Sequence, residues 1–193
     1  MTMTSLRERN RSRAKRDIGA AALTLFEEQG YAATTVEQIA RRAGLSPATF
    51  FRYFGSKEEV LFVNEQDAVD GLVAAVAARR DQAQTLQALS APVVAFAHDY
   101  LNDAEAETQR VTRLVMTTRE LEARSMHMRL RWEHALAKQL ASEQGKEVEA
   151  ADVLLANLAI SCLAAALWQW QSATDAVDVA DATRRMFQLA ATV

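Results

Sequence analysis

Small, hydroxyl-bearing and cationic side chains between residues 46 and 57 carry the most specific chemistry in the sequence. In chain order they are Ser46, Pro47, Ala48, Thr49, Arg52, Tyr53 and Lys57. Small side chains at the start of a helix let it approach base edges, where Ala48 or the methyl group of Thr49 suits a thymine methyl. Cations and phenol hydroxyls can bind phosphate oxygens, and Arg52 could contact either a guanine or a phosphate. The pattern is typical of a short helix that enters the major groove of DNA.

A second basic segment, residues 7–16, lies near the N-terminus and includes Arg11 and Arg13. An arm of this composition could follow the duplex and insert arginine into a narrow, A·T-rich minor groove. It could also be a disordered tail that its charge keeps solvated. Because it precedes a helix suited to the major groove, we favour the DNA-binding interpretation.

The charge of the chain is segregated along its length. The formal net charge of the 193 residues is −3. Residues 1–57 carry ten basic and five acidic side chains, whereas residues 58–193 carry twelve basic and twenty acidic ones. The basic N-terminal third is therefore suited to a polyanion, and the acidic remainder would be repelled by one.

The residue types that most often catalyse reactions or bind metals are sparse and poorly spaced. None of His98, His127 and His134 follows a glutamate by three residues, so the Glu-x-x-His pattern of di-iron bundles is missing. His127 and His134 would lie about 10.5 Å apart along a helix, too far to share one metal. Cys162 lies in an apolar run, where a thiol is inert. We expect no catalytic residue, no metal, no cofactor and no enzyme activity.

The elements that position the DNA-facing residues are predicted from apolar spacing and helix caps. From Asp17 onward, apolar residues fall on one face of a helix that Gly30 ends. Thr35 and Gln38 fit a capping box at the start of a second, short helix. Gly44 follows that helix and permits a left-handed turn.

The third helix is predicted to start at Ser46, with Pro47 in its first turn, where a missing N–H costs nothing. Phe50 and Phe54 are four residues apart, so both can pack against the two preceding helices. Two short helices joined by a glycine turn after a longer helix predict a helix-turn-helix.

Helical spacing continues to the end of the sequence. Further helices are predicted at about 56–80, 84–102, 106–118, 121–144, 149–172 and 175–191, which makes about nine in total. We expect Pro92 to kink or delay the helix over 84–102. With six glycines, two prolines and no sustained strand alternation, the predicted fold class is all-α.

The composition also bears on the cellular compartment. One cysteine cannot form an internal disulfide, which favours a reduced, cytoplasmic protein. No segment approaches about 18 consecutive apolar residues, so we expect no membrane span. The basic N-terminal residues are not followed by an apolar stretch, which argues against a secretory signal.

Four stretches in continuous order within residues 13–62 resemble one known family. They are Phe26–Tyr31, Thr34–Ala40, Ala43–Ser46 and Thr49–Glu59. In these stretches the sequence resembles the TetR family of transcriptional regulators, and Thr49–Phe54 together with the later helices looks like the regulators associated with mycofactocin-type clusters. The resemblance implies a DNA-binding domain, residues 1–57, that contains the basic arm and the helix-turn-helix, followed by a helical effector-binding and dimerisation domain, residues 58–193.

The resemblance also implies roles for individual residues. Thr35 would offer its hydroxyl and neighbouring N–H groups to a phosphate. Lys57 looks like the family's lysine that contacts the DNA backbone, and Tyr53 would donate its hydroxyl to a phosphate. Position 51, commonly tyrosine in the family, is Phe51 here, which lacks the hydroxyl for a polar contact.

The last two predicted helices are more apolar than one chain needs. The helix over 149–172 carries apolar residues over much of its surface, and Met186, Phe187 and Leu189 add to them on the last helix. The earlier of the two could simply be a central core helix. We favour a homodimer interface through both, because the resemblance supports it and paired half-sites on DNA require two-fold symmetry.

Large or adaptable side chains on the middle helices could line an apolar pocket. They are Tyr100, Met116, Met126, Met128, Trp132 and Trp168. The same side chains could simply form the core. A pocket of this composition would suit a small lipophilic effector, such as one that bears an acyl chain.

The sequence therefore predicts a ligand-responsive transcriptional regulator, by family habit a repressor, that binds a palindromic operator in double-stranded DNA as a homodimer. In the dimer, the third helix of each subunit would bind one half-site of the operator, and the two half-sites are about 34 Å apart. A small apolar effector would favour a different spacing of these two helices, so that they no longer fit both half-sites. One alternative is a helical-bundle ligand carrier or enzyme with an incidental helix-turn-helix. Another is an architectural protein that binds DNA without sequence selectivity.

Overall fold

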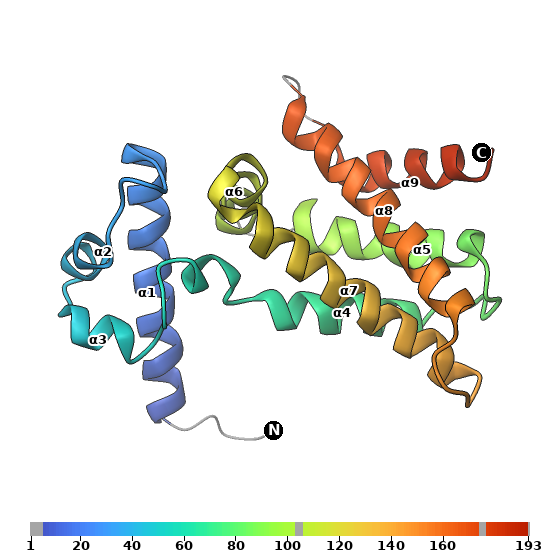
Figure 1. Ribbon diagram of the computed structural model, residues 1–193, viewed down its shortest axis with the longest axis horizontal. Helices are drawn as coiled ribbons and strands as arrows, with labels where there is room; N and C mark the ends of the chain where they lie inside the picture. The colour runs from blue at the N-terminus through green and yellow to red at the C-terminus, as the bar shows by residue number, and fades with distance from the viewer. Residues whose placement is uncertain (1–5, 103–105, 174–176, 193) are drawn as a thin grey trace. The chain divides into compact units, whose positions relative to one another are not determined.

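The computed structural model describes residues 6–102, 106–173 and 177–192, and all regular structure within these ranges is helical. The α-helices are α1 Leu6–Gln29, α2 Val36–Arg42, α3 Pro47–Phe51, α4 Glu65–Ala77, α5 Leu86–Ala97, α6 Ala106–Thr117, α7 Glu122–Glu143, α8 Ala150–Ser172 and α9 Val179–Ala190 (Figure 1). Between them lie two 3₁₀ turns, η1 Glu59–Phe62 and η3 Arg119–Leu121, and one π-helical turn, η2 His98–Asn102. The predicted all-α fold is confirmed.

Contacts divide the chain into two compact units. The first unit contains the described part of residues 1–64 together with Arg110–Leu121, and the second contains residues 65–109 and 122–193. Helix α6 begins in the second unit and ends in the first. The first unit is therefore not one continuous stretch of sequence, because the chain returns to it after α5.

The core of the first unit includes side chains of α1, α2 and α3. Five of them are at most 2% exposed: Ile18, Leu23 and Phe26 of α1, Ile39 of α2 and Phe50 of α3. The short helices α2 and α3 pack on each other and α2 packs on α1. The apolar stripe predicted on the first helix thus faces the helix-turn-helix.

The core of the second unit is formed by α4, α5, α7, α8 and α9. Its fully buried members include Leu72, Leu89, Leu136, Leu140 and Ala159. Helix α9 packs on both α8 and α5, and α7 packs on both α4 and α8. These contacts make the second unit a helical bundle.

The predicted helix over 56–80 is wrong in its continuity. The structure has the 3₁₀ turn η1 and then α4 in its place. Val60, Leu61 and Phe62 are all buried, and three consecutive residues of an α-helix span about 200° of its circumference, too much for one buried face. At the start of η1, the Glu59 carboxylate accepts a hydrogen bond from the backbone N–H of Gly55 at 2.7 Å.

The predicted helix over 84–102 ends as a different helix type. Thr85 caps α5, Pro92 lies inside α5 without delaying it, and His98–Asn102 form the π-helical turn η2. The start predicted for the last helix, residue 175, lies outside the described residues, and α9 begins at Val179 after its cap Asp178. The spacing of apolar residues predicted where these helices lie but not where each one begins and ends.

The basic segment 7–16 was expected to be an arm, and the structure corrects this. From Leu6 onward the segment is part of α1. It contains no glycine or proline, and arginine and lysine are good helix formers. Arg13 also lies 3.9 Å from Asp17 one turn later. Arg11 and Arg13 are therefore exposed side chains of a helix.

Within the described ranges one helix, α8, is long and apolar enough to cross a membrane by length and composition alone. Its residues 150–172 reach a mean hydropathy of 1.9, with 39% of the window buried in the fold. Ala159 and Leu163 are among its buried residues. A buried core helix passes the same test, so this feature is weak evidence for a membrane location.

A buried ion pair ties the end of α4 to the end of α7. Arg79 donates to both carboxylate oxygens of Glu143 at 2.7 Å, and Gln84 and Gln139 donate to the same carboxylate. Burial alone would raise the pKa of Glu143, but these hydrogen bonds outweigh it and the pKa lies below its ordinary value. The two charges compensate each other inside the second unit, so removing either one would leave its partner uncompensated.

We predict that Arg79→Met lowers the free energy of unfolding of the second unit by about 3–5 kcal/mol, because Glu143 would stay buried without its cation. Urea unfolding followed by tryptophan fluorescence measures this unit, since Trp132, Trp168 and Trp170 all belong to it. Arg80→Met, at the exposed neighbour, should change stability by less than about 0.5 kcal/mol. Equal stability of the two variants would contradict the role of the pair.

Candidate nucleic-acid interface

The turn between α2 and α3 has the geometry that the sequence predicts. Gly44 has φ +70°, a backbone conformation that side chains with a Cβ rarely adopt. The N–H of Leu45 donates to the carbonyl of Ala40 at 2.8 Å, and the N–H of Gly44 donates to that of Arg41 at 3.1 Å. These bonds close the end of α2 and set the direction in which α3 starts.

Helix α3 starts at its predicted cap. The Ser46 hydroxyl accepts a hydrogen bond from the N–H of Thr49 at 3.1 Å and lies 2.9 Å from the Thr49 hydroxyl. Pro47 occupies the first helical position. The two hydroxyls therefore bond to each other at the start of the helix, and the Thr49 methyl group remains as an apolar feature.

The two sides of α3 differ sharply. Phe50 is fully buried and Phe54, just beyond the helix, is 3% exposed, with their ring centroids 5.7 Å apart. On the other side Ser46, Pro47, Ala48, Phe51 and Arg52 are exposed. The buried pair holds the helix while small, aromatic and cationic groups face outward.

Two further residues of the predicted set lie at the edge of this face. Thr49 and Tyr53 are half-buried, and the Arg52 guanidinium lies 5.3 Å from the centroid of the Tyr53 ring. Phe51 is 54% exposed, which is unusual for a phenylalanine in a small helical unit. The structure thus brings together, on α3 and at its two ends, the residues predicted between 46 and 53.

The predicted capping box at the start of α2 is present. The Thr35 hydroxyl accepts from the N–H of Gln38 at 3.3 Å, and the N–H of Thr35 donates to the Gln38 side chain at 2.8 Å. The amide of Gln29 on α1 also donates to that oxygen of Gln38 at 2.9 Å. The backbone N–H of Thr35 is therefore engaged, and its hydroxyl hydrogen is the group that could still be donated to a phosphate.

Lys57 lies apart from the exposed face of α3. Its ammonium donates to the backbone carbonyls of Tyr31 at 2.6 Å and Thr34 at 2.8 Å, and it lies 4.3 Å from the centroid of the Tyr31 ring. Burial lowers the pKa of Lys57, with the nearby charge of Glu120 acting in the opposite direction. Local spacing could not predict this contact, because 23 residues or more separate the partners.

A charged contact joins α1 to the segment that returns from the second unit. Arg110 of α6 donates through Nε to Glu27 at 2.8 Å and through a terminal nitrogen to the other carboxylate oxygen. These hydrogen bonds hold the pKa of Glu27 below its ordinary value. Neither residue was singled out in the sequence, where they are 83 positions apart.

Two of the residues predicted to line an effector pocket, Tyr100 and Trp132, belong to one aromatic cluster. Tyr100 and Trp132 have ring centroids 6.4 Å apart, and both contact Phe96, which the sequence analysis missed. The spacing of Phe96 and Tyr100, one helical turn apart, could have indicated it. Burial, together with the charge of Asp67, raises the pKa of the Tyr100 phenol.

The other predicted pocket residues lie elsewhere. Met128 packs at the edge of the second unit's core, Met116 belongs to the first unit, and Trp168 is 66% exposed. In the cluster itself, the buried indole N–H of Trp132 has no hydrogen-bond partner within the described part of the chain. An unpartnered buried donor is rare in folded proteins and marks a place where an acceptor would be stabilised.

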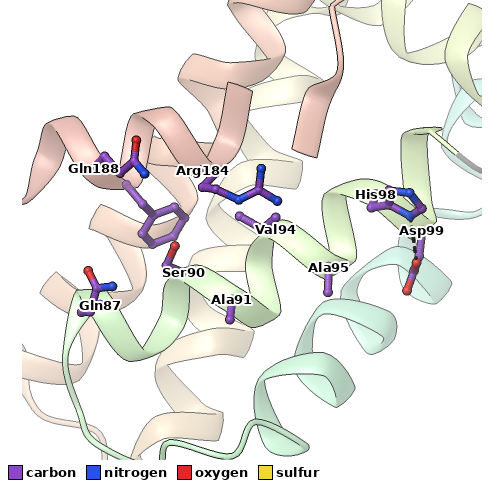
Figure 2. Close-up of a pocket in the computed structure, with 10 residues that line it drawn as sticks. Gln87, Ser90, Ala91, Val94, Ala95, His98, Asp99, Arg184 and Gln188 are labelled. Atoms are coloured by element: carbon purple, nitrogen blue, oxygen red, sulfur yellow. Dashed lines mark hydrogen bonds and ion pairs between the residues drawn. The ribbon is translucent and has the colours of Figure 1, made fainter. Parts of the chain in front are cut away.

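A hollow of about 640 Å³ lies between α5 and α9 (Figure 2). It is lined by Gln87, Ser90, Ala91, Val94, Ala95, His98, Asp99, Arg184, Phe187 and Gln188. None of the predicted effector residues lines it. Its surface mixes polar side chains with small apolar ones and is separate from the aromatic cluster.

The described ranges contain no group of three or more His, Cys, Asp or Glu side chains that could hold a metal ion. His98, His127 and His134 are exposed. Cys162 is buried, and burial raises the pKa of its thiol, so the reactive thiolate is disfavoured.

Comparison with known proteins agrees with this arrangement. The family described as bacterial regulatory proteins, tetR family, matches residues 18–63, and the MftR C-terminal domain matches residues 83–193. The chain is 34% identical over 150 residues to the HTH-type transcriptional regulator TcmR of Streptomyces glaucescens, covering 75% of this chain and 66% of that protein. It therefore spans about two thirds of that relative's length.

Two further proteins are similar. The chain is 32% identical over 141 residues to the mycofactocin biosynthesis transcriptional regulator MftR of Mycobacterium tuberculosis, covering 71% of this chain and 69% of that protein. FadR of Thermus thermophilus, a TetR-family repressor solved with lauroyl-CoA, has a similar fold with a TM-score of 0.56 at 22% identity, covering 91% of this chain and 92% of that one.

The first family match covers the helix-turn-helix, and the second covers the C-terminal helices. The relatives are transcriptional regulators, a class that acts through DNA and not through catalysis. The chain therefore belongs to the TetR family of helix-turn-helix transcriptional regulators, with a C-terminal domain of the MftR type.

Proposed function

We propose that the chain is a repressor that binds a palindromic operator as a homodimer and that a small apolar effector releases it from DNA. The observation that carries the proposal is the exposed side of α3, which is small at its N-terminal end and cationic further along. A helix of this shape can approach base edges in the major groove without a steric barrier. The proposal assigns DNA binding to residues 1–57, and effector binding and dimerisation to residues 58–193.

We assign the DNA contacts by the group that each side chain exposes. Ser46, Pro47, Ala48, Thr49 and Phe51 face the bases, whereas the Tyr53 and Thr35 hydroxyls donate to phosphates. Arg52 reaches either a guanine or a phosphate, and Arg11 and Arg13 contact the backbone from α1. Phosphate contacts fix the position of the protein, and the contacts of α3 provide the sequence selectivity.

Dimerisation is proposed through α8 and α9. Leu154 and Leu158 of α8 and Leu189 of α9 are between 42% and 60% exposed. Exposed apolar side chains clustered on neighbouring helices are typical of an interface. A two-fold dimer presents two copies of α3, which matches a palindromic site.

The effector is proposed to bind at the aromatic cluster of Phe96, Tyr100 and Trp132. The cluster joins α5, η2 and α7, so a ligand there would contact three elements of the second unit. The unpartnered indole N–H of Trp132 favours an effector that has one hydrogen-bond acceptor beside an apolar body. An acyl chain with its carbonyl group has this chemistry, and FadR of Thermus thermophilus was solved with lauroyl-CoA.

Release from DNA follows from differential binding. An effector that binds more tightly to a dimer with misplaced recognition helices shifts the population toward that state by its difference in affinity. Half-sites one helical turn apart, about 34 Å, tolerate little change in helix spacing. Repression relieved by the effector is therefore the proposed sign of regulation.

We predict that Ala48→Glu weakens binding to a selected operator duplex at least about a hundredfold, because a carboxylate would face the negatively charged groove. Ala48 is exposed at the second position of α3, so folding should be unaffected. Ala123→Glu is the matched control, since Ala123 is exposed at the second position of α7. Fluorescence anisotropy measures both, and equal affinity of the two variants would exclude α3 as the recognition helix.

We predict that the double variant Leu154→Arg, Leu158→Arg is monomeric at micromolar concentrations where the unmodified chain is a dimer, because charges would be buried at the interface. Analytical ultracentrifugation measures the association state. Leu130→Arg on α7 is the control, since Leu130 is 51% exposed but lies on another helix. A double variant that still sediments as a dimer would place the interface elsewhere.

We predict that Trp132→Phe raises the lauroyl-CoA concentration needed for half-release of the operator about five- to tenfold, which is the effect of one lost hydrogen bond. Operator affinity without lauroyl-CoA should not change. Leu130→Ala, exposed on the same helix, should leave the half-release concentration unchanged. If Trp132→Phe responds like the unmodified chain, the indole N–H does not contact the effector.

A further inference from the structure

Gly71 lies in the interior of α4, where the backbone does not need a glycine. The helix runs over Glu65–Ala77, and Gly71 is its central residue. Glycine is unfavourable at such a position relative to alanine, because it loses more conformational freedom on folding. The φ of Gly71 is not positive, so its conformation is open to any residue.

Packing does not require a glycine at this position either. Within the described part of the chain, a Cβ added at Gly71 would meet only the ring of Phe96 on α5, with Cε2 at 3.6 Å and Cδ2 at 3.9 Å. Both are ordinary van der Waals distances, so an alanine would fit. Gly71 itself is exposed, whereas Phe96 is 6% exposed. The missing side chain therefore leaves a gap at the surface beside one edge of a buried ring.

The same ring contacts the group that we propose to bind the effector. The centroid of Phe96 lies 5.3 Å from that of Tyr100, in a stacked arrangement, and 5.5 Å from that of Trp132. Trp132 is 7% exposed, and its indole N–H has no hydrogen-bond partner among the described residues. Phe96 thus connects the gap at Gly71 with a buried donor that has room for an acceptor.

A second residue of α4 indicates that this side of the helix lies beside the cluster. Asp67 precedes Gly71 by four residues, so both lie on one face of α4, and both are exposed. Burial raises the pKa of the Tyr100 phenol, and the nearby charge of Asp67 adds to the effect. Tyr100 belongs to the π-helical turn η2, a structure found frequently at functional sites. This face of α4 is therefore open to solvent and close to the aromatic cluster.

We propose that Gly71 marks the entrance to the effector site, where the missing side chain lets an apolar chain enter between α4 and α5 as the ring of Phe96 rotates. The inference rests on the proposed binding of the effector at the aromatic cluster. A linear acyl chain is narrow enough to pass where one side chain is missing, and any larger residue at position 71 would narrow the passage.

An entrance residue has a kinetic signature that separates it from other roles. A side chain that obstructs the passage raises the barrier in both directions, so the association and dissociation rate constants fall together and Kd is unchanged. A side chain that touches the bound effector changes Kd instead. A residue with a purely structural role changes the stability of the fold and leaves both rate constants as they are.

The experiment compares Gly71→Ala and Gly71→Leu with the unmodified full-length chain. Alanine adds only the Cβ that the structure accommodates, whereas leucine would cover the edge of Phe96, and both are better helix formers than glycine. Ala77→Leu is the matched control, since Ala77 is exposed on the same helix about 120° around its axis from Gly71. Stopped-flow tryptophan fluorescence over a series of lauroyl-CoA concentrations gives both rate constants, and thermal unfolding followed by circular dichroism gives stability.

For Gly71→Leu we expect association and dissociation each about tenfold slower, with Kd within about twofold of the unmodified chain. Its thermal midpoint should be at least that of the unmodified chain. Gly71→Ala should slow both steps about threefold, and Ala77→Leu should match the unmodified chain.

Unchanged rate constants in both Gly71 variants would overturn the proposal, and so would a raised Kd with an unchanged association rate. If the unmodified chain does not bind lauroyl-CoA, the proposed effector site is refuted and the entrance with it. Binding by the unmodified chain with equal rates in all variants would refute the entrance alone.

Discussion

The burial of Phe50 is the constraint on which the rest of the first unit depends. Helix α3 has only five residues, and a helix of that length has no stability of its own in water. It exists because Phe50 is fully enclosed, with Ile39 and Phe26 in the same core and Phe54 beside it. Since one side of the helix is fixed inward, its opposite side faces outward, and the same contact both forms the helix and presents its DNA-facing residues.

Several polar contacts refine this arrangement without adding to the core. The Thr35 and Ser46 caps define where the two short helices begin, and the positive φ of Gly44 sets the turn between them. The contact of Arg110 with Glu27 joins α1 to α6, a helix whose first residues belong to the other unit. The first unit thus combines a local motif, which the sequence predicts, with contacts inside the same unit between residues that are far apart in the sequence.

Features of the fold and of the site could be predicted from the sequence where they depend on residues that are close together in the chain. The capping box of Thr35 and the glycine turn are local, so their residue types were sufficient. The break before α4 depends on the burial of three consecutive residues, Val60 to Phe62, which no helical periodicity reveals. The carbonyl partners of Lys57 and the aromatic neighbours of Trp132 come from other elements, and only packing brings them together.

We propose that the outward side of α3 reads a specific operator as part of a two-fold dimer. The most direct test is selection of bound duplexes from random sequence by the full-length chain at physiological salt. We expect a palindromic site with half-sites about one helical turn apart, bound at least about a thousandfold more tightly than a scrambled duplex. Equal affinity for selected and scrambled duplexes would contradict it.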